Sequence, residues 1–196
     1  SVYANSRRGN HIITSKIEHP AVLMCFEKLE KEGFNVTYLD VDKNGIIDME
    51  QLKNSINDKT IFVSVMTVNN ELGSIEPISE IAKLKKKYNF ILHTDAVQAY
   101  TKLQYNRFNM ADLISVSGHK VHALKGIGAL VVKKGTKINP YMLGGGHENG
   151  FRSGTENVVG IASFCKAVEH CGDYDKVREL RDIWKVGVSG IPYNKI

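Results

Sequence analysis

The chain has 196 residues, of which 42% are hydrophobic and 24% are charged, the composition of an ordinary globular protein with room for a good core. Its formal net charge is +5, but the lysines are scattered and Lys85-Lys86-Lys87 is the one tight run, which argues against a nucleic-acid-binding stripe. No apolar run approaches the roughly 20 residues that span a bilayer, and the first residues lack an apolar signal core, so we expect a cytoplasmic protein without a membrane segment.

Short apolar runs alternate with amphipathic helical patterns along the chain. In chain order, strands are predicted over residues 11–15, 34–39, 60–66, 90–93, 113–116 and 127–132. Helices are predicted over residues 20–32, over a short segment that begins at Asp48, and over 77–88, 158–170 and 174–186, while residues 1–8 have the pattern of the end of a helix. This alternation predicts an α/β fold, with a mostly parallel sheet and helices on both of its faces.

The cysteines and the acidic turns give no sign of a disulfide framework or a metal site. The three cysteines, Cys25, Cys165 and Cys171, form no CxxC pair, and the first two fall within apolar helical patterns, where we expect thiols of the core. The segment DVDKNG is similar to a calcium loop but lacks the closing glutamate of an EF-hand. We predict no metal ligands.

Polar side chains follow four of the predicted strands. Because the carboxyl ends of parallel strands meet at one edge of a sheet, and ligands bind in the crevice there, we expect a single shared site. The four residues are His19, Asn70, Asp95 and Lys120.

The segment around Lys120 has the chemistry of an anion site. Ser117-Gly118-His119-Lys120 follows a strand predicted to be buried on both faces, and its hydroxyl, imidazole and ammonium groups suit a phosphate. A lysine whose pKa is lowered from about 10.4 by nearby cations or desolvation can also form a Schiff base with an aldehyde. The alternative is a surface lysine after a strand.

Asp95 and His19 each allow two interpretations. An aspartate at the end of an apolar strand caps the following turn, or it pairs with a cation such as a protonated pyridine nitrogen. His19 stands before Pro20 and begins a helix there, or its neutral ring stacks on an aromatic group and exchanges protons near its ordinary pKa of about 6.5.

Five segments together resemble a known family. The segments ISVSGHK with KGIGAL, IITSKIEHPAV, SVMTVNNELGSIEPI, FILHTDAVQAYTK and GGGHENGFRSGTEN resemble, in the same order, those of pyridoxal-phosphate-dependent class V aminotransferases, and among these the NifS-like cysteine desulfurases. The resemblance spans nearly the whole chain. It implies the large domain of a fold type I, aspartate-aminotransferase-like transferase, with residues 1–186 in a partial cofactor-binding domain and 187–196 at the start of a C-terminal small domain, incomplete at both ends.

The resemblance also implies a role for each site residue. Lys120 would hold pyridoxal 5'-phosphate, Asp95 would pair with its pyridine nitrogen, and His19 would stack on the ring and take part in acid/base steps. Asn70 and Gln98 would bind the phenolate oxygen, Ser117 and His119 the phosphate, and Thr155 the phosphate of a neighbouring subunit in a homodimer. Turn and helix-surface roles for the two amides, and a flexible loop at Thr155, are the alternatives.

The activity that the resemblance implies converts L-cysteine to L-alanine. The sulfur passes to an enzyme persulfide and then to an acceptor such as an iron-sulfur scaffold, for iron-sulfur cluster assembly or thiolation. None of the three cysteines matches the family nucleophile, which we expect beyond Ile196, so the chain alone is expected to be inactive. A selenocysteine lyase, another class V aminotransferase, and a non-catalytic remnant of a cofactor domain remain open as alternatives.

Overall fold

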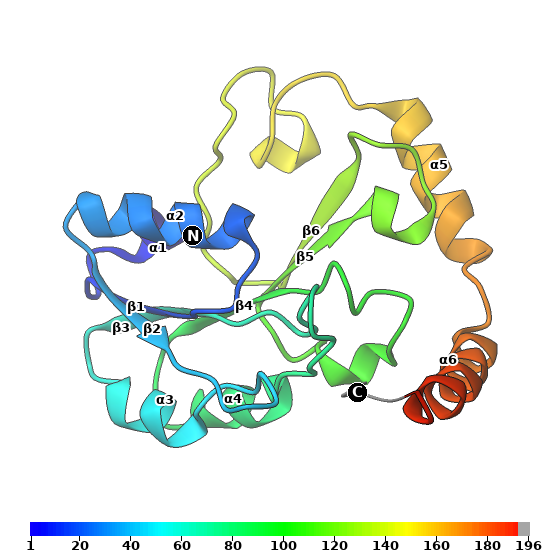
Figure 1. Ribbon diagram of the computed structural model, residues 1–196. Helices are drawn as coiled ribbons and strands as arrows, with labels where there is room; N and C mark the ends of the chain where they lie inside the picture. The colour runs from blue at the N-terminus through cyan, green and yellow to red at the C-terminus, as the bar shows by residue number, and fades with distance from the viewer. Residues whose placement is uncertain (192–196) are drawn as a thin grey trace.

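The computed structural model describes residues 1–191, which form a layered α/β structure around one sheet (Figure 1). The sheet has six strands in the order β2-β1-β3-β4-β5-β6. The strands are β1 (His11–Ser15), β2 (Asn35–Leu39), β3 (Thr60–Ser64), β4 (Ile91–Asp95), β5 (Leu113–Ser117) and β6 (Gly128–Val132). β1 to β5 are parallel and β6 is antiparallel to β5, so the prediction of a mostly parallel sheet is confirmed.

Helices cover both faces of the sheet, as predicted. α1 (Val2–Asn5) and α2 (Pro20–Lys31) lie on one face, and α3 (Met49–Ser55) and α4 (Ile78–Leu84) lie on the other (Figure 1). α5 (Val158–Glu169) and α6 (Tyr174–Ser189) follow β6, and short 3-10 turns are formed by η1 (Tyr105–Arg107), η2 (Gly118–Val121) and η3 (Glu148–Gly150). None of the helices within residues 1–191 is long and apolar enough to cross a membrane.

The central strands β1 and β3 are buried at every position, because helices cover both of their faces. Side chains alternate between faces along a strand, so Ile12 packs toward α2 while Ile13 packs toward α3 and α4. On the α2 side, Phe26 and Leu29 of that helix close over Ile12 and Phe62. This double burial fixes the register of each strand, since a slip of one residue would exchange the two faces.

The prediction of core thiols is wrong for Cys25 and Cys165, because both are exposed. On α2 the buried stripe contains Phe26 and Leu29, and Cys25 lies to the side of it, where its Sγ donates to the carbonyl oxygen of Ala21 at 3.2 Å. An apolar residue type therefore does not decide the face of a helix on which it lies.

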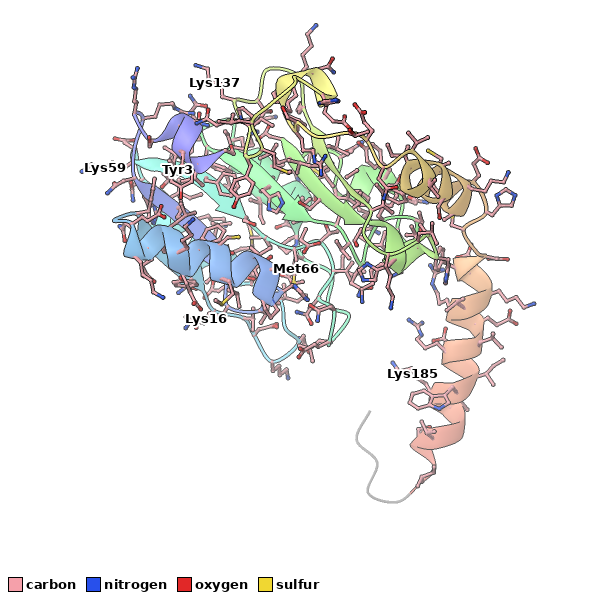
Figure 2. The ribbon with its side chains drawn as sticks, turned by 90° about the horizontal axis from the view of Figure 1, so that it is seen from above. Tyr3, Lys16, Lys59, Met66, Lys137 and Lys185 are labelled. Carbon is pink, nitrogen blue, oxygen red and sulfur yellow. The ribbon has the colours of Figure 1, made fainter. Side chains whose placement is uncertain are left out.

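The end of the chain bears on the domain division predicted after residue 186. α6 continues through this position to Ser189 and buries none of its side chains. In Figure 2 this helix, with Lys185, extends away from the sheet. Residues 192–196 lie outside the described residues, so a small domain that begins at 187 stays a prediction.

Candidate functional site

The four strands that precede the predicted site residues are direct neighbours. β1, β3, β4 and β5 follow one another in the sheet and run parallel, so their carboxyl ends form one continuous edge. The structure places His19, Asn70, Asp95 and Lys120 at this edge, on the loops after the four strands or, for Asp95, on the last residue of its strand. We call it the four-strand edge.

Lys120 lies on η2, the single turn that follows β5 without a break. Ser117 ends β5, and its Oγ lies 2.8 Å from Nδ1 of His119. The turn packs tightly at Gly118, where a Cβ atom would stand 2.7 Å from Cγ2 of Ile127, so a side chain at this position does not fit. The exposed Lys120 ammonium is thus held within one turn of a hydroxyl and an imidazole, as a phosphate site requires.

Asp95 is a partly buried carboxyl that forms no ion pair within residues 1–191. Its Oδ1 accepts a hydrogen bond from the backbone N of Val97 at 2.9 Å, so the turn-capping interpretation is realised. Burial raises the pKa of Asp95, although the bond from Val97 and the charge of His19 act in the opposite direction. A cationic ring nitrogen at this carboxyl would relieve the cost of its burial.

A row of hydrogen bonds joins β3, β4 and β5 two residues before Asp95. Nδ1 of His93, on β4, lies 2.8 Å from Oγ of Ser64 on β3, and its Nε2 lies 2.9 Å from Oγ of Ser115 on β5. Burial lowers the pKa of His93 to about 4, so its ring is neutral and donates through one nitrogen while it accepts through the other. Asp95 is two residues further along the same strand and therefore shares the face of His93.

Gln98 lies on the turn after β4, where its side chain is bound by Lys102, a residue that the sequence did not suggest. Nζ of Lys102 donates to Oε1 of Gln98 at 2.7 Å. This bond occupies the amide oxygen and leaves the amide NH2 group as the available donor, which suits a phenolate acceptor. Burial, and then the charge of Lys120, lower the pKa of Lys102. Its spacing of four residues from Gln98 was the signal that could have identified it.

His19 caps α2 in this structure. Its Nδ1 accepts a hydrogen bond from the backbone N of Ala21 at 3.1 Å, which is the helix-start role considered from the sequence. A neutral ring that accepts through Nδ1 carries its proton on Nε2. The exposed side chain is thereby oriented by the helix, and capping does not exclude a second role toward a ligand.

Asn70 is exposed, whereas its neighbour Asn69 is buried and structural. The Asn69 side chain donates to the carbonyl oxygen of Ile17 at 2.9 Å and accepts from the backbone N of Glu71 and Leu72 at 2.9 and 2.8 Å. The two adjacent asparagines therefore differ, because Asn69 joins two loops while Asn70 is exposed on the loop after β3.

Thr155 is not part of this cluster. It is exposed on the loop between η3 and α5, and within residues 1–191 its side chain makes no hydrogen bond to the four-strand edge.

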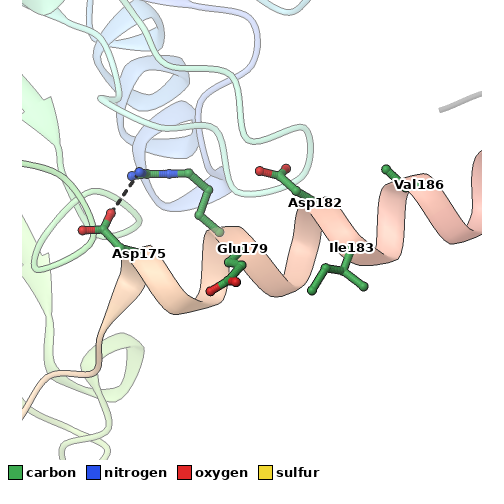
Figure 3. A pocket seen from close by; sticks show the side chains of 6 residues that line it. Asp175, Glu179, Asp182, Ile183 and Val186 are labelled. Carbon is green, nitrogen blue, oxygen red and sulfur yellow. Dashed lines mark ion pairs between the residues drawn. The ribbon is translucent and has the colours of Figure 1, made fainter.

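Figure 3 shows a surface groove on α6, lined by Asp175, Glu179, Asp182, Ile183 and Val186 together with Arg178. This groove contains none of the site residues. The described part of the chain holds no group of three His, Cys, Asp or Glu side chains suited to a metal ion.

Comparisons with known proteins identify the family of the chain. A family model described as aminotransferase class-V matches residues 1–183. The cysteine desulfurase IscS of Clostridium botulinum is 53% identical over 168 residues, which cover 85% of the chain and 42% of that protein. The chain thus spans less than half the length of this relative.

Two solved structures are also similar. A NifS-like protein has 39% identity and a TM-score of 0.82, covering 86% of this chain and 47% of that one. A structure of SspA in complex with cysteine has 38% identity and a TM-score of 0.81, covering 88% and 50% of the two chains.

Proposed function

Because the chain belongs to the class-V aminotransferase family, we propose that it forms the pyridoxal-phosphate-binding part of a cysteine desulfurase. The observation that carries this proposal is the four-strand edge, which brings the exposed Lys120 to the same edge of the sheet as the partly buried Asp95. These two groups match two functional groups of pyridoxal phosphate. A lysine can bind its aldehyde, and a carboxylate can keep its pyridine nitrogen protonated.

The side chains of the edge fit the remaining groups of the cofactor. A bound pyridoxal phosphate would supply an electron sink for the substrate carbanion. Within the chain, Lys120 would hold the cofactor and its amine would take the substrate α-proton, Asp95 would pair with the pyridine nitrogen, and His19 would lie against the ring. Asn70 and the Lys102-oriented amide of Gln98 donate toward the phenolate oxygen, and Ser117 and His119 bind the phosphate.

For the whole protein we propose that L-cysteine is the substrate and L-alanine the product. Support comes from the names of the similar desulfurases and from the similar SspA structure, which is a complex with cysteine. A cysteine outside this chain takes the sulfur as a persulfide and passes it to an acceptor protein, such as an iron-sulfur scaffold. Of the three cysteines, Cys25 lies on α2, Cys165 on α5 and Cys171 just after α5.

We further propose that the protein is a cytoplasmic homodimer in which Thr155 serves the partner's site. Large apolar side chains stand exposed on β6, on the loop after it and at the start of α5, and a surface of this kind is normally covered by protein. They are Leu130, Val131, Tyr141, Leu143, Val158 and Val159.

The test is a visible absorption spectrum of the protein with added pyridoxal phosphate. We expect a band characteristic of a lysine-bound cofactor, which borohydride abolishes while fixing the cofactor to the chain. The band should vanish in Lys120→Ala and persist in Lys125→Ala, an exposed lysine of the same loop that serves as the matched control. A band that survives Lys120→Ala, or that is missing from the full-length protein, would refute the assignment.

A further inference from the structure

A buried carboxyl that none of the assigned roles uses joins two loops of the site. Glu18 directly precedes His19 and is 3% exposed. Its Oε1 accepts hydrogen bonds from the backbone N of Met66 at 2.7 Å and from Oγ of Ser15 at 2.8 Å. Met66, labelled in Figure 2, belongs to the segment after β3, so Glu18 connects the exit of β1 to the exit of β3.

A second hydrogen bond connects the same two segments. Asn69, after β3, donates to the carbonyl oxygen of Ile17, after β1. The residues that follow the two anchoring side chains are His19 and Asn70, which are the site residues of these loops. The loop positions that carry His19 and Asn70 are therefore tied together by this pair of cross-links, which we call the loop clamp.

The surroundings of Glu18 favour its neutral form. Its Oε2 is buried without a hydrogen-bond partner within residues 1–191, and a negative charge on such an oxygen is costly. The charged groups that act on it from neighbouring elements are two further carboxyls, Asp95 at the end of β4 and Glu76 before α4. Burial is the main cause that raises the pKa of Glu18, to about 8.

We propose that Glu18 is a protonated positioning residue, which holds His19 and Asn70 at the distance that the cofactor ring requires. It acts through these two neighbours and is not itself catalytic. A protonated carboxyl keeps Oε1 as an acceptor for Met66 and Ser15 and carries its proton on Oε2. This proposal rests on the proposed function, and it adds a residue from outside the set that the sequence had suggested.

The first test measures protonation without cofactor. Infrared spectra of the full-length protein should show a protonated carboxyl band at neutral pH that disappears with a midpoint near the folded-state pKa of about 8. The band should be absent from Glu18→Gln and unchanged in Glu71→Gln, an exposed glutamate close by. A neutral-pH spectrum that is identical in wild type and Glu18→Gln would overturn the proposal.

The second test measures positioning, through the pH profile of pyridoxal-phosphate affinity. Wild type should lose affinity at alkaline pH as Glu18 ionises, and Glu18→Gln, which stays neutral and keeps its oxygen, should not. Glu18→Asp, whose side chain is one methylene shorter, should bind pyridoxal phosphate about tenfold more weakly at every pH. This is the effect expected from the loss of about one neutral hydrogen bond in the loop clamp. An alkaline loss that is the same in Glu18→Gln would contradict the proposal.

The two tests separate the possible failures. If wild type binds no cofactor but the infrared band titrates, then the proposed function fails and with it the cofactor role of Glu18, while its protonation stands. If wild type binds the cofactor and the infrared band is missing, then the proposed function survives and the role of Glu18 as a neutral group is rejected.

Discussion

The ammonium group of Lys102 and the side-chain amide of Gln98 are joined by a hydrogen bond of 2.7 Å, donated by Nζ to Oε1. The bond decides which end of the amide faces the four-strand edge, because the oxygen is already occupied. Burial lowers the pKa of Lys102, and the charge of Lys120 lowers it further.

Lys102→Met should therefore weaken the binding of pyridoxal phosphate. The loss of a charge-assisted hydrogen bond that orients Gln98 corresponds to about 1.5 kcal/mol, or roughly tenfold in affinity. A cofactor titration followed by visible absorption measures it. Lys102→Arg is the control, since it keeps both the donor and the charge, and equal affinities of wild type and Lys102→Met would show that Gln98 needs no partner.

Gly118→Ala should destabilise the turn that carries Lys120. The new Cβ would stand 2.7 Å from Cγ2 of Ile127 and 3.2 Å from Cβ of Ala123, and such overpacking costs about 1–3 kcal/mol. Urea unfolding measures the change in the free energy of unfolding. Gly172→Ala is the matched control, because nothing lies within 4 Å of its added Cβ, and similar losses in the two variants would contradict the steric explanation.

Glu18 should make the protein less stable as the pH rises. Its folded-state pKa of about 8 lies above the ordinary 4.5, so between these values the folded state keeps a proton that the unfolded state has lost. The stabilising contribution is complete below about 4.5 and is lost as the pH rises through 8. Since one pKa unit corresponds to about 1.4 kcal/mol, the loss over this window is on the order of 5 kcal/mol. Unfolding curves of Glu18→Gln across the same pH range should lack this slope, whereas an unchanged slope would assign the effect to another group.

His93 should make the protein less stable as the pH falls. Its folded-state pKa of about 4 lies below the ordinary 6.5, so the unfolded state binds a proton first as the pH falls. The contribution is complete above about 6.5 and is lost as the pH falls through 4. An NMR titration of the histidine ring should show no shift near the ordinary pKa. A ring that titrates at its ordinary value would mean that the bonds to Ser64 and Ser115 open readily.

The sequence by itself determined the elements and the chemistry at their ends. The runs of β1 and β3 are strands whose two faces are both buried, a requirement that shows directly in their β-branched and apolar residue types. The polar residues His19, Asp95 and Lys120 interrupt this pattern at the strand exits, so their placement followed from local order along the chain. Motif resemblance then identified the family.

Only the tertiary structure decided which groups meet. The adjacency of β1, β3, β4 and β5 depends on pairing between segments that are distant in sequence, and it alone brings the four exits to one edge. The same holds for Glu18, whose ionisation depends on burial and on Met66, 48 residues away. Cys25 lies within an apolar helical pattern yet is exposed, because the face of α2 that packs on the sheet carries Phe26 and Leu29 instead. Periodicity records what each segment can bury, whereas the packing of distant segments decides what is buried and against which partner.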